Sequence, residues 1–144
     1  LIPILNNLDA VILNREEASA LTGIAYEDAL GIFKKMDELV KGIIVVTDGP
    51  RGVMVSDGRN IYKAGIFKEN NLVDRTGAGD AFGSGFVAGL VIKKEDIKYA
   101  IRFASANATS VVEKIGAKEG ILRKEDFENS SRFNNLEIVT EPVI

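Results

Sequence analysis

The 144-residue chain contains neither cysteine nor histidine. Without cysteine, a disulfide framework and a thiolate metal site are both excluded. Without histidine, Ser-His-Asp hydrolysis, histidine-ligated zinc and general-base catalysis by histidine are excluded as well. Any acid–base chemistry in this protein must therefore be carried out by Asp, Glu, Lys or Tyr side chains.

The sequence also lacks long apolar runs and a strong excess of either charge. No run reaches the ~20 residues of a membrane span and no signal peptide is visible, so we expect a cytoplasmic protein without membrane contact. A formal net charge of −3 and a pI near 5.1 argue against nucleic acid as a main partner. With 46% apolar residues, the chain can bury one core and is one domain at most.

Short apolar runs alternate with helical periodicity along the chain. Runs typical of strands occur at residues 10–13, 43–47, 53–56, 60–63 and 72–73. Helical spacing occurs at residues 2–8, 18–22, 26–40 and 97–114, and in the stretch after Gly79. This alternation predicts an α/β fold of three layers, in which helices flank a mostly parallel sheet with an antiparallel hairpin at one edge.

The most distinctive stretch lies at residues 73–86, with the sequence VDRTGAGDAFGSGF. A turn rich in glycine that opens a helix leaves backbone N–H groups unpaired at the positive end of the helix dipole, and such an arrangement binds oxyanions. Asp80 fits beside an anion if the site handles a hydroxyl and a phosphate together, with the carboxylate taking the hydroxyl proton. The alternative is that Gly77 and Gly79 only form a turn and Asp80 only caps the helix.

Two other interpretations of this stretch fail. Residues 83–88 fit the dinucleotide-binding fingerprint only in letters, because they lie inside the helix and not at its start. The chain contains no Gly-Lys-Ser/Thr triplet, so it is not a P-loop protein. We expect Gly83, Gly85, Ala88 and Gly89 to let this helix lie close against a sheet or a nucleotide.

The string DRTGAGDAFGSG at residues 74–85 resembles the C-terminal signature of the ribokinase-like (phosphofructokinase-B type) carbohydrate kinases. The resemblance implies that Asp80 is the catalytic base and that Gly77, Ala78 and Gly79 form the anion hole. Arg75 departs from the signature, since the family usually has Thr, Ser, Pro or Val at this position. Arg75 is either a surface side chain or a positive charge near the phosphates or an anionic substrate.

Asn14 and Glu17 follow the first predicted strand, at the sheet edge where open α/β sheets bind ligands. As local chemistry, Asn14 is a helix N-cap and Glu17 is its capping-box partner. The pair also resembles the Asn-x-x-Glu motif of the same family. That resemblance implies that Glu17 helps to hold Mg²⁺, usually through water, and that Asn14 reaches toward the nucleotide phosphates. Both roles are compatible, because a capping residue can also face a ligand.

A third segment resembles the ATP site of the family. Thr47, Gly49 and Gly52 match its Thr-x-Gly-x-x-Gly pattern, although a plain turn between two strands explains the same residues. Arg51, within this segment, is either a phosphate ligand or a solvated surface side chain. Further along, Ser105 is at the position that the resemblance places nearest to adenine, and a buried small residue in a helix is the alternative.

The signature also raises the question of a monovalent cation. Asp74 either braces its turn or binds K⁺ together with the Thr76 carbonyl, as the resemblance implies. The segment at residues 115–117 resembles the family turn whose carbonyls complete that site. Beyond Gly120 the sequence is less informative: residues 123–129 predict a short helix, and the tail to Ile144 has no assignment.

The three motifs occur in the order of the family within residues 10–120. We therefore expect residues 1–144, which open on Leu1 without a methionine, to be a single portion: the C-terminal, nucleotide-binding part of a longer kinase. The Gly-Gly sugar-binding signature and the lid strands of the N-terminal half are absent, which leaves the activity of the fragment alone open. The expected reaction is ATP- and Mg²⁺-dependent phosphorylation of a hydroxymethyl group on a sugar or nucleoside. A homodimer of the full-length protein is left open.

Two alternatives to that function remain at this stage. One is a non-catalytic nucleotide-binding module, although such a module has no use for Asp80 beside an intact Gly-Ala-Gly turn. The other is a kinase for a vitamin precursor of the hydroxymethyl-pyrimidine type, which shares the base and the anion hole in the same superfamily. The identity of the acceptor is not encoded in these motifs.

Overall fold

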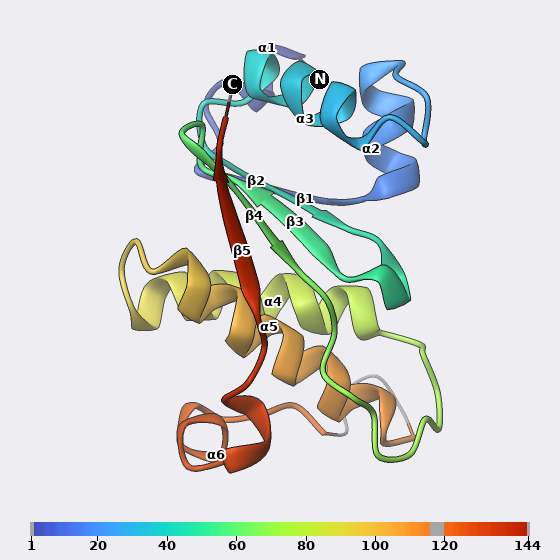
Figure 1. The fold of residues 1–144 in the computed structure, drawn as a ribbon, viewed down its shortest axis with the longest axis vertical. Helices are drawn as coiled ribbons and strands as arrows, with labels where there is room; N and C mark the ends of the chain where they lie inside the picture. The colour runs from blue at the N-terminus through green and yellow to red at the C-terminus, as the bar shows by residue number, and fades with distance from the viewer. Residues whose placement is uncertain (1, 116–119, 144) are drawn as a thin grey trace. The chain divides into compact units, whose positions relative to one another are not determined.

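The computed structural model describes residues 2–115 and 120–143. The chain divides into two compact units, of which the first comprises Leu1–Ala64 with Ile138–Ile144 and the second comprises Gly65–Glu137. The first unit contains α1 (Ile2–Leu5), β1 (Ala10–Asn14), α2 (Arg15–Thr22), α3 (Ala29–Leu39), β2 (Ile43–Thr47), η1 (Gly49–Arg51), β3 (Val53–Ser56), β4 (Asn60–Ala64) and β5 (Ile138–Pro142) (Figure 1). The second contains α4 (Ala78–Ile92), α5 (Ile97–Val112), α6 (Lys124–Glu128) and η2 (Ser131–Phe133).

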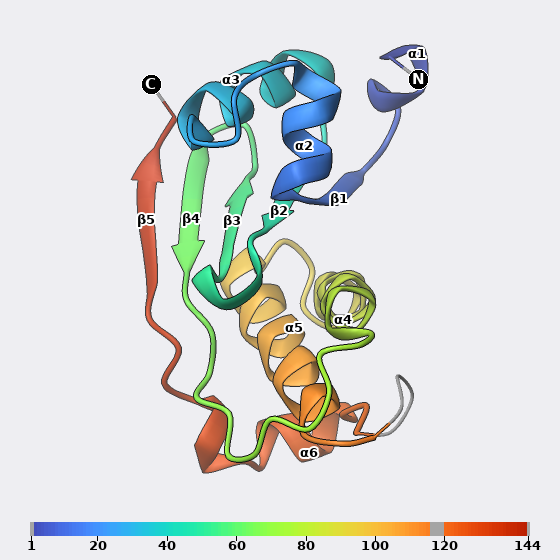
Figure 2. The same cartoon turned by 90° about the vertical axis from the view of Figure 1, so that its right-hand side faces the viewer.

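The sheet belongs to the first unit and has the strand order β1-β2-β3-β4-β5. β1 and β2 are parallel, with Asn14 paired to Thr47 at their ends. The other three pairings are antiparallel. The α/β class and the β3–β4 hairpin are therefore confirmed, but the sheet is mixed and not mostly parallel, and β5 lies beyond the hairpin as an additional strand (Figure 2).

Two segments account for the difference in the sheet. The strand predicted at residues 72–73 does not form, because the amides of Val73 and Asp74 both donate to the Val112 carbonyl, at 2.9 and 3.1 Å, instead of to a neighbouring strand. The unassigned tail supplies β5, whose β-branched residues 138–140 suit a strand. One expected strand is thus replaced by an unexpected antiparallel one.

A hydrophobic cluster joins the helices of the first unit to the sheet. Ile44 and Val46 of β2 point to the same face, as alternate residues of a strand do, and both are buried. The cluster also includes Leu5, Val11, Ala18, Ile32, Phe33, Met36 and Val40. α3 begins only at Ala29, because Asp28 accepts a hydrogen bond from the Gly31 amide as its N-cap. The amphipathic helix predicted at residues 26–40 is confirmed with a later start.

In the second unit, glycines bring α4 and α5 close together. A Cβ added at Gly89 would lie 2.7 Å from the Ala100 Cα, and one added at Gly85 would lie 3.0 Å from the Ala104 Cα. These two glycines therefore make room for a neighbouring helix. The expectation of a sheet or a nucleotide at this place is corrected for Gly85 and Gly89.

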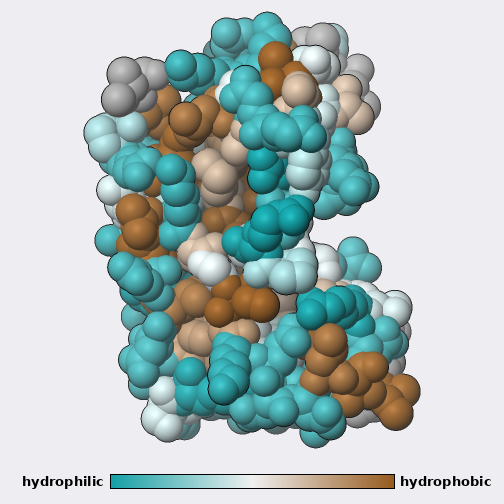
Figure 3. Space-filling view, turned by 45° about the vertical axis from the view of Figure 1, so that its right-hand side comes forward, coloured by the Kyte–Doolittle hydropathy of each residue, from teal (hydrophilic) through white to brown (hydrophobic). Residues whose placement is uncertain are grey.

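On the face shown in Figure 3, hydrophilic residues predominate and hydrophobic residues form several separate groups. Among the described residues, no helix combines the length and the apolar character that crossing a membrane requires.

Candidate active site

The signature forms a turn at the start of α4. The N-cap is Gly77, whose φ of 81° is in the left-handed region that glycine adopts without strain. Just before it, the Oδ1 atom of Asp74 accepts a hydrogen bond of 2.9 Å from the Thr76 amide, which lowers the pKa of the Asp74 carboxyl. Asp74 therefore braces the turn, as the first of its two predicted roles requires. The second predicted role, binding of K⁺ by Asp74 and the Thr76 carbonyl, stays a prediction.

The backbone amides of this turn fall into two groups. The Ala78 amide donates to the Arg75 carbonyl at 3.2 Å and is thus engaged. The amides of Gly77, Gly79 and Asp80 have no acceptor within the part of the chain that the structure describes. An added Cβ at Gly79 would meet nothing within 4 Å, so the space before it is open. Of the three predicted anion-hole residues, Gly77 and Gly79 keep a free donor, whereas Ala78 would first have to release Arg75.

Asp80 lies in the first turn of α4 and is exposed. Its carboxylate has no hydrogen bond or ion pair to any residue in 2–115 or 120–143. Because Gly77 is the N-cap and no side-chain capping bond is present, the alternative in which Asp80 caps the helix is wrong. The carboxylate is available to an external ligand.

Arg75, the departure from the signature, lies on the surface. Its side chain is 51% exposed and contacts Glu69, with 3.5 Å between the Arg75 Nη1 and Glu69 Oε1 atoms. This contact fits the surface interpretation of Arg75. A role toward an anionic substrate stays a prediction.

A buried asparagine that the sequence analysis missed supports the start of α4. Asn107, on α5, is only 3% exposed, and its Nδ2 donates to the Ala81 carbonyl at 2.8 Å. Its Oδ1 accepts from the Leu122 amide at 2.9 Å. Both functions of the amide are used, so Asn107 ties three segments together. An isolated Asn on the apolar face of a long helix was the sequence signal available for it.

A second missed contact holds the loop that leads to the signature. Glu113 forms an ion pair with Arg132, and the Nη1 to Oε2 distance is 2.9 Å. The Glu113 carboxylate also accepts from the Asn70 amide at 2.7 Å, while Arg132 Nη2 donates to the Lys68 carbonyl at 3.0 Å. The Arg132 hydrogen bond lowers the pKa of Glu113 below its ordinary value. The loop is thereby fixed to the end of α5 without being part of the sheet.

In the first unit, Asn14 and Glu17 form the capping box of α2. The Asn14 Oδ1 accepts from the Glu17 amide at 2.8 Å, and the Glu17 Oε2 accepts from the Asn14 amide at 2.9 Å. The local role of both residues is confirmed. Both are exposed, and the Glu17 Oε1 has no partner among the described residues, so one carboxylate oxygen is left for water or a metal.

The structure brings two predicted nucleotide-binding motifs together in the first unit. Thr47 is the register partner of Asn14, so the ends of β1 and β2 carry the two motifs side by side. After Thr47, Gly49 and Gly52 have φ values of 53° and 98°, which glycine accommodates most readily. Ser105 lies in α5 of the second unit and is 5% exposed, as its structural alternative expects.

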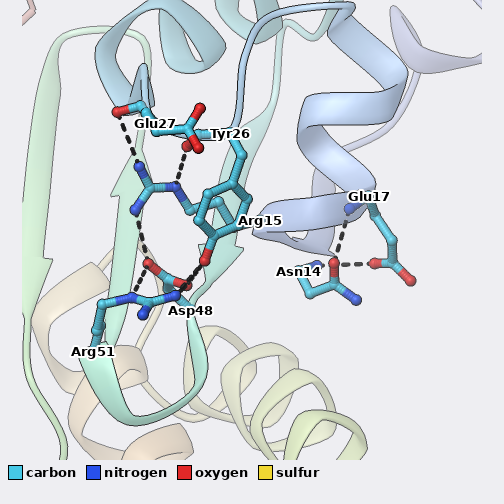
Figure 4. A network of polar contacts seen from close by, with 7 residues as sticks. All are labelled: Asn14, Arg15, Glu17, Tyr26, Glu27, Asp48 and Arg51. Carbon is cyan, nitrogen blue, oxygen red and sulfur yellow. Dashed lines mark hydrogen bonds and ion pairs between the residues drawn. The ribbon is translucent and has the colours of Figure 1, made fainter.

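A network of charged and aromatic residues surrounds Asp48, directly after Thr47 (Figure 4). The carboxylate accepts hydrogen bonds from Arg15 Nη1 at 2.8 Å, from the Tyr26 hydroxyl at 2.7 Å and from Arg51 Nη2 at 2.7 Å. The Arg51 hydrogen bond, followed by those of Tyr26 and Arg15, holds the pKa of Asp48 well below its usual range. Arg51, predicted either to bind phosphate or to be free in solvent, is 66% exposed and paired with Asp48.

The described residues contain no preformed cluster of metal ligands. Within the described ranges, no group of three or more acidic side chains is arranged to hold a metal ion. Mg²⁺ at Glu17 through water therefore stays a prediction. Of the expected third segment of the cation site, Ile115 is described and exposed, whereas residues 116 and 117 lie outside the described residues.

Comparison with known proteins agrees with these motifs. The solved structure of Arabidopsis thaliana ribokinase complexed with ribose and ATP matches with a TM-score of 0.78 and 27% identity, over 88% of this chain and 41% of that one. The fold is therefore that of the ribokinase-like α/β proteins. Residues 3–124 match the profile of the pfkB family carbohydrate kinases, and the chain belongs to this family.

Curated relatives share about a third of the residues. Ribokinase of Haemophilus influenzae is 33% identical over 127 residues, which covers 85% of this chain and 40% of the relative. Cytidine kinase of Thermococcus kodakarensis is 32% identical over 114 residues, which covers 78% of this chain and 40% of the relative. The chain thus spans less than half the length of these relatives.

Proposed function

We propose that this protein is an ATP-dependent kinase that phosphorylates a hydroxymethyl group of a sugar or nucleoside. The observation that carries the proposal is the exposed, unpaired carboxylate of Asp80 beside the free amides of Gly77 and Gly79. A proton acceptor next to unpaired amides suits a reaction in which one oxygen loses a proton while neighbouring oxygens gain negative charge. The names of the relatives, a ribokinase and a cytidine kinase, support the acceptor class.

In the proposed reaction, Asp80 takes the proton of the acceptor hydroxyl as that oxygen attacks the γ-phosphorus of ATP. The bond between the γ-phosphorus and the bridging oxygen breaks, and ADP leaves with the electron pair. The amides of Gly77 and Gly79 donate to the oxygens of the transferring group, together with Ala78 once its amide is released. Because the amides are fixed by the helix, they stabilise this charge without reorganising.

The nucleotide is assigned to the residues that the motifs single out. Asn14 would bind the phosphates, Thr47, Gly49 and Gly52 would bind ATP, and Ser105 would lie near adenine. Glu17 would hold Mg²⁺ through water, because its Oε1 is free in the described structure, and the metal would neutralise phosphate charge. Asp74 and the Thr76 carbonyl offer oxygen ligands of the kind that K⁺ requires, although one Asp74 oxygen already accepts the Thr76 amide.

The test is consumption of ATP by the intact protein with a panel of acceptors. Ribose and other sugars, cytidine and other nucleosides, and hydroxymethyl-pyrimidines are each supplied with ATP and Mg²⁺. We expect ADP and a phosphorylated product with at least one sugar or nucleoside. Consumption only with a hydroxymethyl-pyrimidine would replace the acceptor class. ATP binding without consumption with any acceptor would leave a nucleotide-binding module and refute the kinase.

A further inference from the structure

The turn at Thr47–Gly52 has few constraints of its own. Its internal bonds are short-range: the Asp48 amide donates to the Gly52 carbonyl at 2.8 Å, and the Gly52 amide donates to the Gly49 carbonyl at 3.0 Å. Gly49 and Gly52 carry no side chain, and a Cβ added at Gly49 would meet nothing within 4 Å. These bonds define the shape of the turn, but its placement depends on the strands at its ends and on side chains that reach out of it.

Asp48 is the side chain that anchors the turn to the helical part of the unit. It is 17% exposed in its side chain and accepts from both Arg15 and the Tyr26 hydroxyl. Arg51 also reaches the Tyr26 hydroxyl, but it is 66% exposed. An exposed ion pair contributes little, whereas hydrogen bonds to a half-buried carboxylate contribute more. The firm part of the anchor is therefore Asp48 with Arg15 and Tyr26.

Arg15 is itself fixed before it reaches Asp48. Its Nε donates to the Tyr26 carbonyl at 2.8 Å, and its Nη2 donates to the Glu27 carbonyl at 3.2 Å. Its guanidinium carbon lies 4.5 Å from the centre of the Tyr26 ring. Since Nε and Nη2 already donate to these two carbonyls, the Nη1 group of the planar guanidinium is left to donate to Asp48. The Arg15 side chain is therefore held in one orientation by its neighbours.

The Arg15–Asp48 ion pair lies between the motif that contains Asn14 and the motif that contains Thr47. Asn14 and Thr47 are register partners at the ends of the parallel strands β1 and β2. Arg15 and Asp48 are the next residue on each side, so their ion pair continues the pairing past the end of the sheet (Figure 4). A change at Asp48 would therefore alter how the turn lies beside Asn14.

We propose that Asp48 is a positioning residue that holds the Thr47–Gly52 turn in the orientation that binds the phosphoryl donor. Asp48 acts through the turn and does not contact the donor. A turn that is already ordered loses less conformational entropy when the donor binds. The effect is therefore on the affinity for the donor and not on the chemical step. This inference rests on the proposed function, in which the same turn binds ATP.

The kinetic test uses Asp48→Asn in the intact protein. Asn keeps the shape, but it loses the charge and replaces one of the two acceptor oxygens with an N–H group. It cannot accept all the hydrogen bonds from Arg15, Tyr26 and Arg51, so the anchor is weakened. We expect the KM for ATP to rise by about tenfold or more, with kcat and the KM for the acceptor within about twofold of wild type. Arg15→Lys should give the same pattern, because a single ammonium cannot reach three separate acceptors.

Asp57→Asn is the matched control. Asp57 also holds a tight turn, accepting from the amides of Arg59 at 2.8 Å and Asn60 at 2.6 Å, but it lies in the β3–β4 hairpin. This variant should leave the KM for ATP at its wild-type value. The positioning role would be refuted if Asp48→Asn lowered kcat without raising the KM for ATP. It would also be refuted if the variant left the KM for ATP unchanged.

A second measurement does not need activity. Hydrogen exchange of the Asp48 and Gly52 amides reports whether the turn opens, and the amide of Asp57, which donates to the Asn60 carbonyl, is an internal reference. We expect exchange at the turn to accelerate about tenfold or more in Asp48→Asn while the reference is unchanged. If the wild-type protein never consumes ATP, the proposed function fails and exchange alone decides whether Asp48 orders the turn. Unchanged exchange would refute the inference.

Discussion

Asn107 donates its side-chain N–H to the Ala81 carbonyl over 2.8 Å, from the middle of α5 to the first turn of α4. Since its Oδ1 accepts from the Leu122 amide at the same time, neither end of the side-chain amide can be replaced without leaving a polar group unpaired. The candidate anion hole and Asp80 stand on that first turn. A buried amide on a neighbouring helix thus supports the start of the predicted catalytic helix.

Asn107→Asp should destabilise the fold, because the carboxylate removes the donor to Ala81 and buries a charge. We expect the free energy of unfolding to fall by about 1–3 kcal/mol, as is usual for a buried polar group left without its partner. Urea denaturation followed by circular dichroism measures the change. Asn135→Asp, at an exposed position, is the control and should change stability by less than about 0.5 kcal/mol. Equal stability of the two variants would contradict the role given to Asn107.

Asp80→Asn should abolish turnover while ATP still binds. The carboxylate has no structural partner among the described residues, so its loss should not unfold the protein, but the proton acceptor disappears. We expect kcat to fall by about 10²- to 10⁴-fold, the range typical of a lost general base, with a dissociation constant for ATP close to wild type. Calorimetry and steady-state kinetics on the intact protein measure the two quantities.

The matched control for Asp80 is Glu125→Gln. Glu125 is likewise an exposed acidic residue in the first turn of a helix, α6, and should leave kcat unchanged. A common loss of ATP binding and turnover in Asp80→Asn would mean that Asp80 is structural. Full activity of the variant would remove it from the mechanism.

Local rules were enough to predict several of these features. The capping box of Asn14 and Glu17 follows from their spacing of three residues, and the structure contains both of its hydrogen bonds. A glycine-rich turn that opens a helix was also expected here, and α4 begins directly after Gly77. Such features depend on residues that are close in sequence, so the local sequence is enough to predict them.

Other features depend on partners far away in the sequence. β5 pairs with β4 and adds an ion pair between Lys63 and Glu141, which are 78 residues apart. Arg15 and Asp48, 33 residues apart, meet only because β1 and β2 are adjacent and parallel. In isolation, Arg15 belongs to an ordinary charged stretch and Asp48 to an ordinary turn. No local pattern marks either residue as half of a pair.

Gly79→Ala should separate activity from stability. The added methyl group would meet no atom within 4 Å, and alanine favours a helix over glycine by up to about 1 kcal/mol, so the fold should be as stable as wild type or slightly more so. If the phosphoryl group approaches this turn as proposed, the methyl group would crowd it next to the free amides. We expect kcat to fall by about 10²-fold, comparable to the loss of one anion-hole donor.

Gly89→Ala on the same helix should behave in the opposite way. Its methyl group would lie 2.7 Å from the Ala100 Cα, and backbone must shift to accept it, so we expect a loss of about 1–3 kcal/mol in the free energy of unfolding. Thermal unfolding and kinetics on both variants provide the comparison. Wild-type kcat in a folded Gly79→Ala variant would contradict the proposed approach of the phosphoryl group to this turn.

The Glu113–Arg132 ion pair should make stability depend on pH in the acid range. Arg132 lowers the folded-state pKa of Glu113 below its ordinary value of 4.5. A depressed folded pKa means that the unfolded chain takes up the proton first as the pH falls. The stability that the ion pair contributes is therefore present above about pH 4.5 and is lost as the pH falls through the folded pKa. Glu113→Gln cannot gain or lose this contribution.

Urea denaturation at pH 7 and pH 3 tests that expectation. Wild type should lose more unfolding free energy between the two pH values than Glu113→Gln, because only wild type has this carboxylate to protonate. Glu137→Gln is the control, since Glu137 is exposed and has no ion pair among the described residues, so it should keep the wild-type pH dependence. An equal slope in wild type and Glu113→Gln would show that the ion pair adds nothing to the hold on the loop before α4. Contacts such as that between Phe67 and Phe133, whose ring centres lie 5.2 Å apart, would then be left to hold it.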